Sequence, residues 1–328
     1  MARGLREAFG VTEFEDIRMI KGLAASMVYR IVVRGSPFLL KISMRTNEPA
    51  RHYACMKVAA EAGVAPRVRY ASPEDRISIE DFVNATPLPM KDALVRMPAV
   101  LRTLHALAPF PKVPDHLNNT CVFLMNKGVA DGFLQQFRAA DLLPKGESEK
   151  LFASYEQLDA AYPRHDADMV SSHNDLFKPE NILFDGNRVW LVDWEASFRN
   201  DRYADLAVVA NLVVTNDDEE RIFLEQYFGQ APAAYQLARL FLMRQLAHMF
   251  YAAIYLMMGA SGKPIDWNKP VPEFSDVQRR LWAGEIDLTD SHGKTVFGRA
   301  HWARFSENLR HSRYNEALGI VSGRKASA

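Results

Sequence analysis

The sequence is poor in cysteine, carries no net charge and contains no long uninterrupted apolar run. Its 328 residues include two cysteines, Cys55 and Cys121, which form no CxxC pair, so we expect neither a disulfide framework nor a zinc site. Lysine plus arginine and aspartate plus glutamate both number 40. Because these charges balance, the composition does not favour a nucleic acid or an anionic membrane as a partner.

Signals for membrane insertion and secretion are also lacking. The most apolar region, residues 237–258, is interrupted by Arg239, Arg244 and His248, so it predicts a buried helix and not a membrane span. The first residues contain no apolar core of the kind that a secretion signal carries. The chain is long enough for a large core and for two lobes. We therefore expect a globular, cytoplasmic protein with no membrane partner.

The stretch from residue 171 to residue 195 is the most informative part of the chain. His173 and Asp175 are followed by Asn181, and Asp193 ends a second apolar run. In phosphoryl-transfer sites, one Asp orients or accepts the proton of an attacking hydroxyl, while an Asn and a second Asp hold Mg²⁺ against nucleotide phosphates. Each of these residues alone is typical of a cap or a turn, but their joint spacing favours a phosphoryl-transfer site.

The local pattern places two of these residues side by side. Residues 181–184 and 189–192 are short β-type runs, and the turn-forming residues 185–188 separate them. This pattern predicts a β-hairpin. Asn181 and Asp193 then lie at the adjacent ends of its two strands.

The sequence resembles the aminoglycoside phosphotransferase and choline/ethanolamine kinase superfamily, which shares the protein-kinase-like fold. The resemblance covers residues 15–320, and its His-Asn-Asp opening and Asp-Trp-Glu triplet are most similar to the choline kinase side. The residues that carry it are His173, Asn174, Asp175, Asn181, Asp193-Trp194-Glu195 and the segment from Asn200 to Ala207.

The resemblance implies an α+β, two-lobed architecture. Residues 1–83 would form a small nucleotide-binding lobe with an antiparallel sheet and one helix. Residues 84–328 would form a larger, mainly helical lobe that holds the catalytic and substrate-binding residues. It also implies that the protein is an ATP- and Mg²⁺-dependent small-molecule kinase.

The resemblance assigns roles to the residues of the central stretch. Asp175 would be the catalytic base, and Asn181 and Asp193 would bind Mg²⁺. The family pattern has its Asn five residues after the catalytic Asp, whereas Asn181 follows Asp175 by six and Glu180 takes the fifth position. Glu180 therefore stays an alternative metal ligand.

The N-terminal lobe would bind the nucleotide. In the turn over residues 21–27, Gly22 and Ser26 would approach the phosphates, although a plain hairpin turn explains the same residues. Lys41, in an apolar strand, matches the family's phosphate-binding lysine. The backbone of Asp81 and Val83 would contact the adenine edge at the hinge between the lobes.

One residue argues against catalysis. Related kinases pair the strand lysine with a Glu early in the following helix, but that position holds His52, which cannot replace a carboxylate. Glu48 or Glu61 would have to substitute, or the phosphates alone would position Lys41. The alternative is a nucleotide-binding pseudokinase. Protein kinase activity is disfavoured because no Asp-Phe-Gly or Ala-Pro-Glu segment follows Asn181.

The acceptor is expected to be a small, positively charged alcohol. Glu195 and the aromatic residues Trp194, Phe198 and Tyr203 suit an ammonium group, so choline or ethanolamine is the leading candidate. An aminoglycoside is the alternative, since it needs a wider and more acidic pocket. The acidic run 217–220 is the feature that suits it, although a solvated helix N-terminus explains that run equally simply.

Further elements follow from periodicity and turn residues. We expect strands over 17–20, 28–34, 37–44, 67–70 and 76–82, and helices over 48–62, 98–107, 119–139, 147–161, 205–214, 217–228, 233–258, 275–283 and 296–318.

Overall fold

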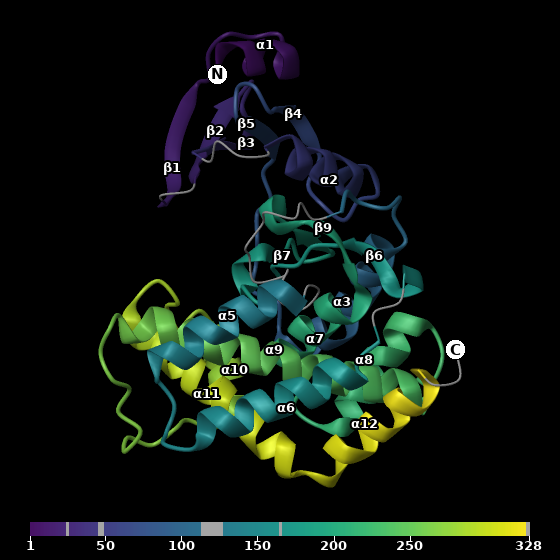
Figure 1. Ribbon diagram of the computed structural model, residues 1–328. Helices are drawn as coiled ribbons and strands as arrows, with labels where there is room; N and C mark the ends of the chain where they lie inside the picture. Colours follow the sequence, from purple (N-terminus) through teal and green to yellow (C-terminus); the bar gives the residue numbers. More distant parts are fainter. Residues whose placement is uncertain (24–25, 45–48, 113–126, 164–165, 326–328) are drawn as a thin grey trace. The chain divides into compact units, whose positions relative to one another are not determined.

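The structure is a computed structural model that describes residues 1–23, 26–44, 49–112, 127–163 and 166–325. Its internal contacts divide the chain into two compact units (Figure 1). The first unit comprises Met1–Leu88, Thr103–Lys112 and Val170–Arg199; the second comprises Pro89–Arg102, Val113–Met169 and Asn200–Ala328. The stretch from residue 171 to residue 195 thus belongs to the same compact unit as the N-terminal sheet. A functional boundary between residues 83 and 84 stays a prediction.

The first unit is built on a five-stranded antiparallel sheet with the strand order β1-β2-β3-β5-β4. Its strands are β1 (Asp16–Leu23), β2 (Ser26–Val33), β3 (Ser36–Ser43), β4 (Val68–Ser72) and β5 (Ile77–Asp81). The predicted small antiparallel lobe is therefore confirmed. The predicted turn over residues 21–27 is shorter than expected, because Gly22 pairs with Met27 and Leu23 with Ser26 inside the β1–β2 ladder.

One face of this sheet carries an apolar core. The fully buried side chains of Ile31, Leu40 and Ile79 meet Leu5 of helix α1 (Ala2–Phe9). Gly4 lets the helix approach closely, since a Cβ at this position would lie 2.9 Å from the Tyr70 ring. Helix α2 (Pro49–Glu61) is the helix predicted over residues 48–62, and α1 is a second helix in this unit.

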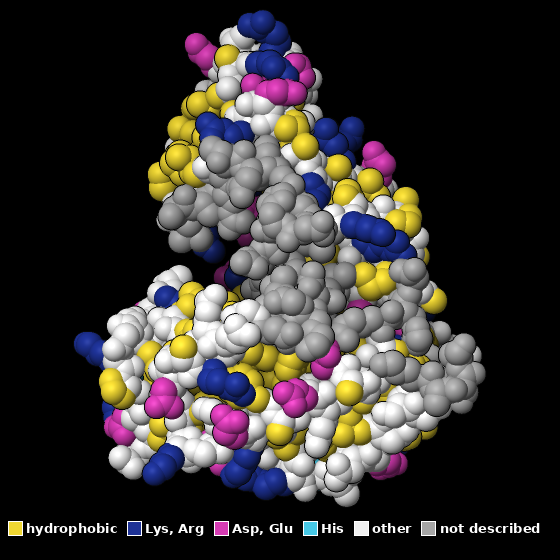
Figure 2. Space-filling model, in the orientation of Figure 1, with side chains coloured by type: hydrophobic (Ala, Val, Ile, Leu, Met, Phe, Trp, Pro, Cys, Tyr) yellow, Lys and Arg dark blue, Asp and Glu magenta, His cyan; other side chains and the backbone are white. Residues whose placement is uncertain are grey.

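The edge strand β1 is less well covered. Ile17, Met19 and Ile20 are 39%, 54% and 51% exposed, and apolar side chains gather over this strand on the face shown in Figure 2. These three side chains of β1 are therefore much more exposed than the cluster around Leu5.

The predicted hairpin is confirmed. Strands β7 (Ile182–Phe184) and β8 (Val189–Leu191) pair antiparallel, with Ile182 opposite Leu191. The turn between them contains Gly186 at a φ of 93°, a conformation that favours glycine. Strands β6 (Met169–Ser172) and β9 (Phe198–Asp201) form a further two-stranded sheet.

The second unit is helical, and its helices pack around α9. This helix contacts α5, α6, α7, α11 and α12 (Figure 1). It is long and apolar enough to cross a membrane, but 89% of its most apolar window is buried inside the protein, as in the core helix of a soluble protein. The helices are α3 (Met90–His105), α5 (Lys127–Ala140), α6 (Glu147–Ala161), α7 (Arg202–Val213), α8 (Asp217–Phe228), α9 (Ala234–Ala260), α10 (Phe274–Trp282), α11 (Ser291–Arg310) and α12 (Ser312–Lys325).

Several predicted helix ends were wrong. Helix α3 begins at Met90, eight residues before the predicted start, and accommodates Pro98 in its interior. The single helix predicted over 296–318 is two helices, because His311 leaves the helical conformation between α11 and α12. Helix α11 also begins earlier than predicted, where the Asp290 carboxylate accepts hydrogen bonds from His292 N and Gly293 N. The first residues of the helix predicted over 119–139 lie outside the described residues.

Candidate functional site

The loop between β6 and β7 is held by its own side chains. Asn174 has a φ of 68°, and its side-chain amide donates to the carbonyls of Ala196 and Phe198 at 3.2 and 3.3 Å. His173 Nε2 lies 2.9 Å from the Val192 carbonyl oxygen. His173 therefore braces the loop against the strand that leads to Asp193.

Asp175 lies in this loop between a cation and an amide. Lys178 Nζ donates to Asp175 Oδ2 at 2.7 Å, and Asn181 Nδ2 donates to the Asp175 carbonyl oxygen at 2.8 Å and to Oδ2 at 3.1 Å. Burial raises the pKa of Asp175, and the attraction of Lys178 opposes that rise. The carboxylate is thus fixed in direction while its proton affinity stays above that of an ordinary Asp.

Asn181 is joined to both Asp175 and the strand before Asp193. Its backbone carbonyl accepts from Val192 N at 3.0 Å, so the two hairpin ends meet as predicted. Its Nδ2 bonds to Asp175, and its Oδ1 accepts no hydrogen bond from another described residue. The alternative ligand Glu180 is 57% exposed, and its carboxylate lies 3.9 Å from Lys21 Nζ. This arrangement supports Asn181 over Glu180 as the partner of Asp175.

Asp193 meets Lys41 directly. Lys41 Nζ donates to Asp193 Oδ1 at 2.7 Å, although 152 residues separate them in the chain. Burial works against ionisation of Asp193, but Lys41 and, further away, Lys178 outweigh it and lower the pKa of Asp193 to about 2. Asp193 has a φ of 68°, which turns the chain sharply after β8. The carboxylate is therefore ionised across the physiological pH range.

Lys41 has a second carboxylate partner, which we did not anticipate in this role. Glu195 Oε1 lies 2.8 Å from Lys41 Nζ. Of the two substitutes proposed from the sequence, Glu48 lies outside the described residues, and no ion pair joins Glu61 to Lys41 within the described part of the chain. Burial works against the charge on Lys41, but the two carboxylates outweigh it and raise its pKa.

Helix α2 supports this ion pair without supplying a carboxylate. Arg51 Nη2 donates to the Glu195 carbonyl oxygen at 3.0 Å, and Arg51 Nη1 donates to the Ser197 carbonyl oxygen. Burial lowers the pKa of His52 to about 4, so the ring is neutral at pH 7. The loss of the family's helix Glu is thus offset by Glu195, which approaches Lys41 from the segment after the hairpin.

The aromatic residues predicted to surround a substrate cation are buried. Trp194, Phe198 and Tyr203 are 2%, 0% and 3% exposed. Trp194 packs against His173, with 4.7 Å between ring centroids, and Tyr203 lies under the guanidinium of Arg239 at 4.6 Å. This part of the cation-binding prediction was wrong, because these rings serve packing. A role for Glu195 in holding the substrate stays a prediction.

The predicted nucleotide contacts lie at the edges of the same unit. Gly22 and Ser26 lie in the strands of the β1–β2 hairpin, next to residues that are not described. Asp81 N donates to the Arg67 carbonyl, and the Asp81 carboxylate binds Arg69 at 2.6 and 3.1 Å. Val83 follows β5, and its backbone forms no hydrogen bond with another described residue. The contacts of Asp81 and Val83 with a base stay predictions.

The oxygen ligands expected for Mg²⁺ fit this site. Asn181 Oδ1 and Asp193 Oδ2 accept no hydrogen bond from a described residue, and Mg²⁺ prefers oxygen ligands completed by phosphates and water. Across the described ranges there is no cluster of three or more His, Cys, Asp or Glu side chains suited to a metal. The residues therefore suit an ion shared with a nucleotide and not a metal held by protein alone.

Lys178 and Arg51 are site residues that the sequence reasoning missed. Lys178 lies three positions after Asp175 in the sequence, and this short spacing is a signal that the two side chains can form an ion pair. Arg51 had no comparable signal, since its partners are backbone carbonyls 144 and 146 residues away.

Comparisons with known proteins find solved structures that are similar to this chain. A choline/ethanolamine kinase family protein from Mesorhizobium loti has a similar structure, with a TM-score of 0.67, 20% identity and coverage of 98% of both chains. Choline kinase LicA from Streptococcus pneumoniae has a TM-score of 0.54 and 15% identity, covering 86% of this chain and 97% of its own. Spectinomycin phosphotransferase APH(9)-Ia, in complex with ADP and spectinomycin, has a TM-score of 0.52 and 14% identity, covering 92% and 97%.

These solved structures share the kinase-like fold with this chain, which confirms the predicted fold class. No curated protein sequence matches the chain. A sequence model of the phosphotransferase enzyme family matches residues 16–241, more than half of the chain. The chain belongs to the phosphotransferase enzyme family.

Proposed function

We propose that this phosphotransferase transfers the γ-phosphate of ATP, with Mg²⁺, to the hydroxyl of a small cationic amino alcohol of the choline or ethanolamine type. The observation that carries the proposal is the convergence of Asp175, Asn181, Asp193 and Lys41 within one compact unit. A protein that only bound a nucleotide would not need a buried, oriented carboxylate such as Asp175. This consideration favours catalysis over the pseudokinase alternative.

Asp175 would act on the acceptor hydroxyl. Lys178 and Asn181 restrict the direction of its carboxylate, and a fixed carboxylate aligns an attacking oxygen better than a mobile one. The raised pKa of Asp175 brings its proton affinity closer to the operating pH, which favours proton transfer from the alcohol. Positioning and a modest proton-accepting role are what phosphoryl transfer requires of such a residue.

Lys41 and Lys178 would offset the charge of the phosphates. Both ammonium groups keep a raised pKa in their buried setting, because carboxylates lie beside them. Glu195 would hold Lys41 in place, as the helix Glu does in related kinases, with Arg51 fixing the backbone of Glu195. Gly22, Ser26, Asp81 and Val83 would contact the nucleotide from the sheet.

Asn181 and Asp193 would hold Mg²⁺, which when bound neutralises charge on the phosphates. Asp193 is suited to this by its low pKa, since a ligand that is already ionised pays no cost of deprotonation. The interaction of Asp193 Oδ1 with Lys41 leaves Oδ2 for the ion. Asn181 contributes a neutral oxygen, so the protein itself adds a single negative charge to the metal site.

The acceptor class rests on comparison more than on geometry. The similar structures from Mesorhizobium loti and Streptococcus pneumoniae are described as a choline/ethanolamine kinase family protein and a choline kinase. An aminoglycoside acceptor is the second candidate, because the spectinomycin phosphotransferase shares the fold. The acidic run 217–220, which would suit an aminoglycoside, forms the first turn of α8, and the Asn216 side chain caps this helix.

A substrate panel tests the proposal. The purified chain would be incubated with ATP and Mg²⁺ and with choline, ethanolamine, longer amino alcohols, aminoglycosides and neutral sugars, and phosphorylated product would be measured by mass spectrometry. We expect the highest kcat/KM for an amino alcohol. A preference for neutral sugars would refute the cationic acceptor, and nucleotide binding without any phosphorylated product would favour the pseudokinase alternative.

A further inference from the structure

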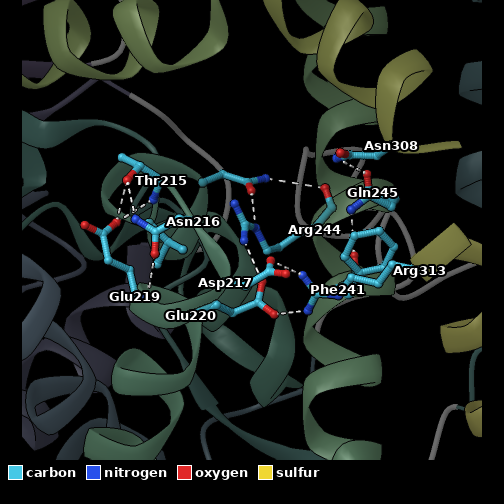
Figure 3. Close-up of polar contacts among 12 residues, drawn as sticks. Thr215, Asn216, Asp217, Glu219, Glu220, Phe241, Arg244, Gln245, Asn308 and Arg313 are labelled. Atoms are coloured by element: carbon cyan, nitrogen blue, oxygen red, sulfur yellow. Dashed lines mark hydrogen bonds and ion pairs between the residues drawn. The ribbon is translucent and has the colours of Figure 1, made fainter. Parts of the chain in front are cut away.

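The helical unit contains a polar cavity that the proposed reaction does not use. It has a volume of about 210 Å³ and lies where the start of α8 meets α9 and the end of α11. Arginine and amide side chains line it, and Figure 3 shows how Arg244 and Arg313 reach toward Glu220 there. Its lining includes the side chains of Arg244, Arg304, Arg313, Asn308 and His311.

The charged side chains at this cavity, three arginines and three carboxylates, differ in burial. Glu220, with 1% of its side chain exposed, pairs with Arg244 at 2.6 Å and also with Arg313. Arg304 adds a third guanidinium to the lining. The remaining carboxylates, Asp217 and Glu307, are 76% and 64% exposed, so solvent screens them strongly. The buried carboxylate of Glu220 is therefore shared by two guanidinium groups, those of Arg244 and Arg313.

Arg244 has an unused donor in this setting. Its side chain is 11% exposed; Nε donates to Asn211 Oδ1 at 2.8 Å and Nη1 donates to Glu220. Nη2 bonds to no other residue in the described part of the chain. Burial lowers the pKa of Arg244, and the charges of Arg304 and Arg313 lower it further despite Glu220. A further anion next to Nη2 would offset the repulsion between Arg244 and these two arginines.

Contacts with neighbouring residues hold four further lining side chains in place. His311 Nδ1 accepts from Arg313 N at 3.2 Å, so a neutral ring carries its proton on Nε2. Asn308 Nδ2 donates to Gln245 Oε1 at 2.8 Å, which anchors that amide beside the cavity. The guanidinium of Arg313 packs on the Phe241 ring at 4.5 Å, and that of Arg304 has one bond, from Nη1 to Glu307.

We propose that this cavity is a second binding site, separate from the phosphoryl-transfer residues, for a small oxyanion of the phosphate class. Guanidinium groups match the oxygens of phosphate in pairs of parallel hydrogen bonds, which chloride cannot form. Arg244 Nη2, the free donors of Arg304 and His311 Nε2 supply the contacts. The ligand is inorganic phosphate or the phosphate group of a small monoester, such as a phosphorylated alcohol.

Binding of inorganic phosphate to the full chain tests the site. Isothermal titration calorimetry would be run with sodium phosphate at constant ionic strength, sodium chloride replacing phosphate in the reference, and again with a phosphate monoester of an amino alcohol. We expect phosphate to bind and Arg304→Gln to weaken binding about tenfold or more, because a charged donor is lost. His311→Gln should weaken it less. The ligand with the lower Kd, inorganic phosphate or the monoester, identifies the source of the phosphate group.

Arg279→Gln is the matched control. Arg279 also pairs with an acidic residue three positions away, at 2.7 Å from Asp276, but it does not line the cavity. This variant should bind phosphate as the wild type does. Lys41→Gln separates the two sites, since phosphate held at the phosphoryl-transfer residues would be lost in that variant and kept in Arg304→Gln. That pattern, or no phosphate binding at constant ionic strength, would overturn the proposal.

Discussion

Both units bury charged side chains, but they satisfy them differently. In the helical unit, Arg239 is 0% exposed; it donates to Asp168 and Asp201 at 2.8 Å, and to the Tyr162 hydroxyl at 3.1 Å. The rings of Tyr162 and Tyr203 flank its guanidinium at 4.6 Å. In the sheet-containing unit, Lys41 pairs with Asp193, whose side chain is 39% exposed.

The difference separates a structural network from the candidate site. Asp201, Tyr162 and Tyr203 around the Arg239 guanidinium are themselves buried, so the network stabilises the packing of several segments. Asn181 Oδ1 and Asp193 Oδ2 instead stay free of hydrogen bonds to described residues and available to a ligand. Buried charge by itself does not indicate a functional site; charge with unused, accessible oxygens does.

The largest effect is expected for Asp175→Asn. The amide keeps the shape of the side chain but cannot accept the proton of the acceptor, so kcat should fall about 10²- to 10⁴-fold. ATP affinity, measured by calorimetry, should change little, because Asp175 would contact the acceptor and not the nucleotide. If the variant keeps wild-type turnover, Asp175 is not the base.

Arg239→Gln should have the largest effect on stability. It leaves Asp201 and Asp168 without their buried counter-ion, and removing one partner of a buried ion pair costs about 3 to 5 kcal/mol. Urea denaturation followed by circular dichroism measures this loss. The kcat of the folded fraction should stay near that of the wild type. A selective loss of kcat with unchanged stability would remove the distinction between the two networks.

Asp193→Asn should change the dependence on metal. Losing the charged oxygen should raise the Mg²⁺ concentration needed for half-maximal activity about 10- to 100-fold, the range for disrupted metal sites. Titration of activity with Mg²⁺ at saturating ATP measures it. Glu180→Gln is the control for the alternative ligand and should leave the titration unchanged. If Glu180→Gln shifts the titration instead, the metal ligand is Glu180 and not Asn181.

Lys178→Gln should shift the pH profile. Lys178 opposes the rise in the pKa of Asp175 that burial causes, so its removal lets that pKa rise further. Asp175 accepts a proton only when ionised, and activity is lost as the pH falls through its pKa. The acidic limb of kcat/KM should therefore move to higher pH. Lys150→Gln, at an exposed pair with Glu147, is the control and should leave the limb in place.

The smallest effect is expected for Glu195→Gln, and it decides between two roles. If Glu195 positions Lys41, the KM for ATP should rise about 3- to 10-fold, as loss of one charge-assisted contact implies, with the KM for the acceptor unchanged. If Glu195 holds the cation of the acceptor, as predicted from the sequence, the KM for the acceptor should rise instead. Steady-state kinetics with each substrate varied separates the two.

The elements that local patterns encode were largely predictable. The β7–β8 hairpin follows from two β-type runs around a glycine turn, and it brings Asn181 beside the residues preceding Asp193 as expected. Helix ends were less predictable. The break at His311 involves no proline or glycine. The start of α3, eight residues before Pro98, follows no clear pattern of apolar residues.

The partners of the site residues were harder to predict than the residues themselves. Lys41 and Glu195 are far apart in the sequence, and neither has a local feature that points to the other. Trp194 and Phe198 were expected at a cation site because of their position next to Glu195, but packing buries both. Proximity in sequence indicates which residues share a segment and does not determine which way their side chains face.

The sequence by itself determined the class of chemistry, because catalytic loops and hairpins are short-range features whose spacing is visible in the chain. Tertiary structure alone decided which carboxylate pairs with Lys41, which aromatic rings are buried, and that two arginines of the helical unit pair with one buried glutamate. The physical reason is that ion pairs and burial depend on distances between distant segments. Those distances are set only when the apolar faces of sheet and helices pack.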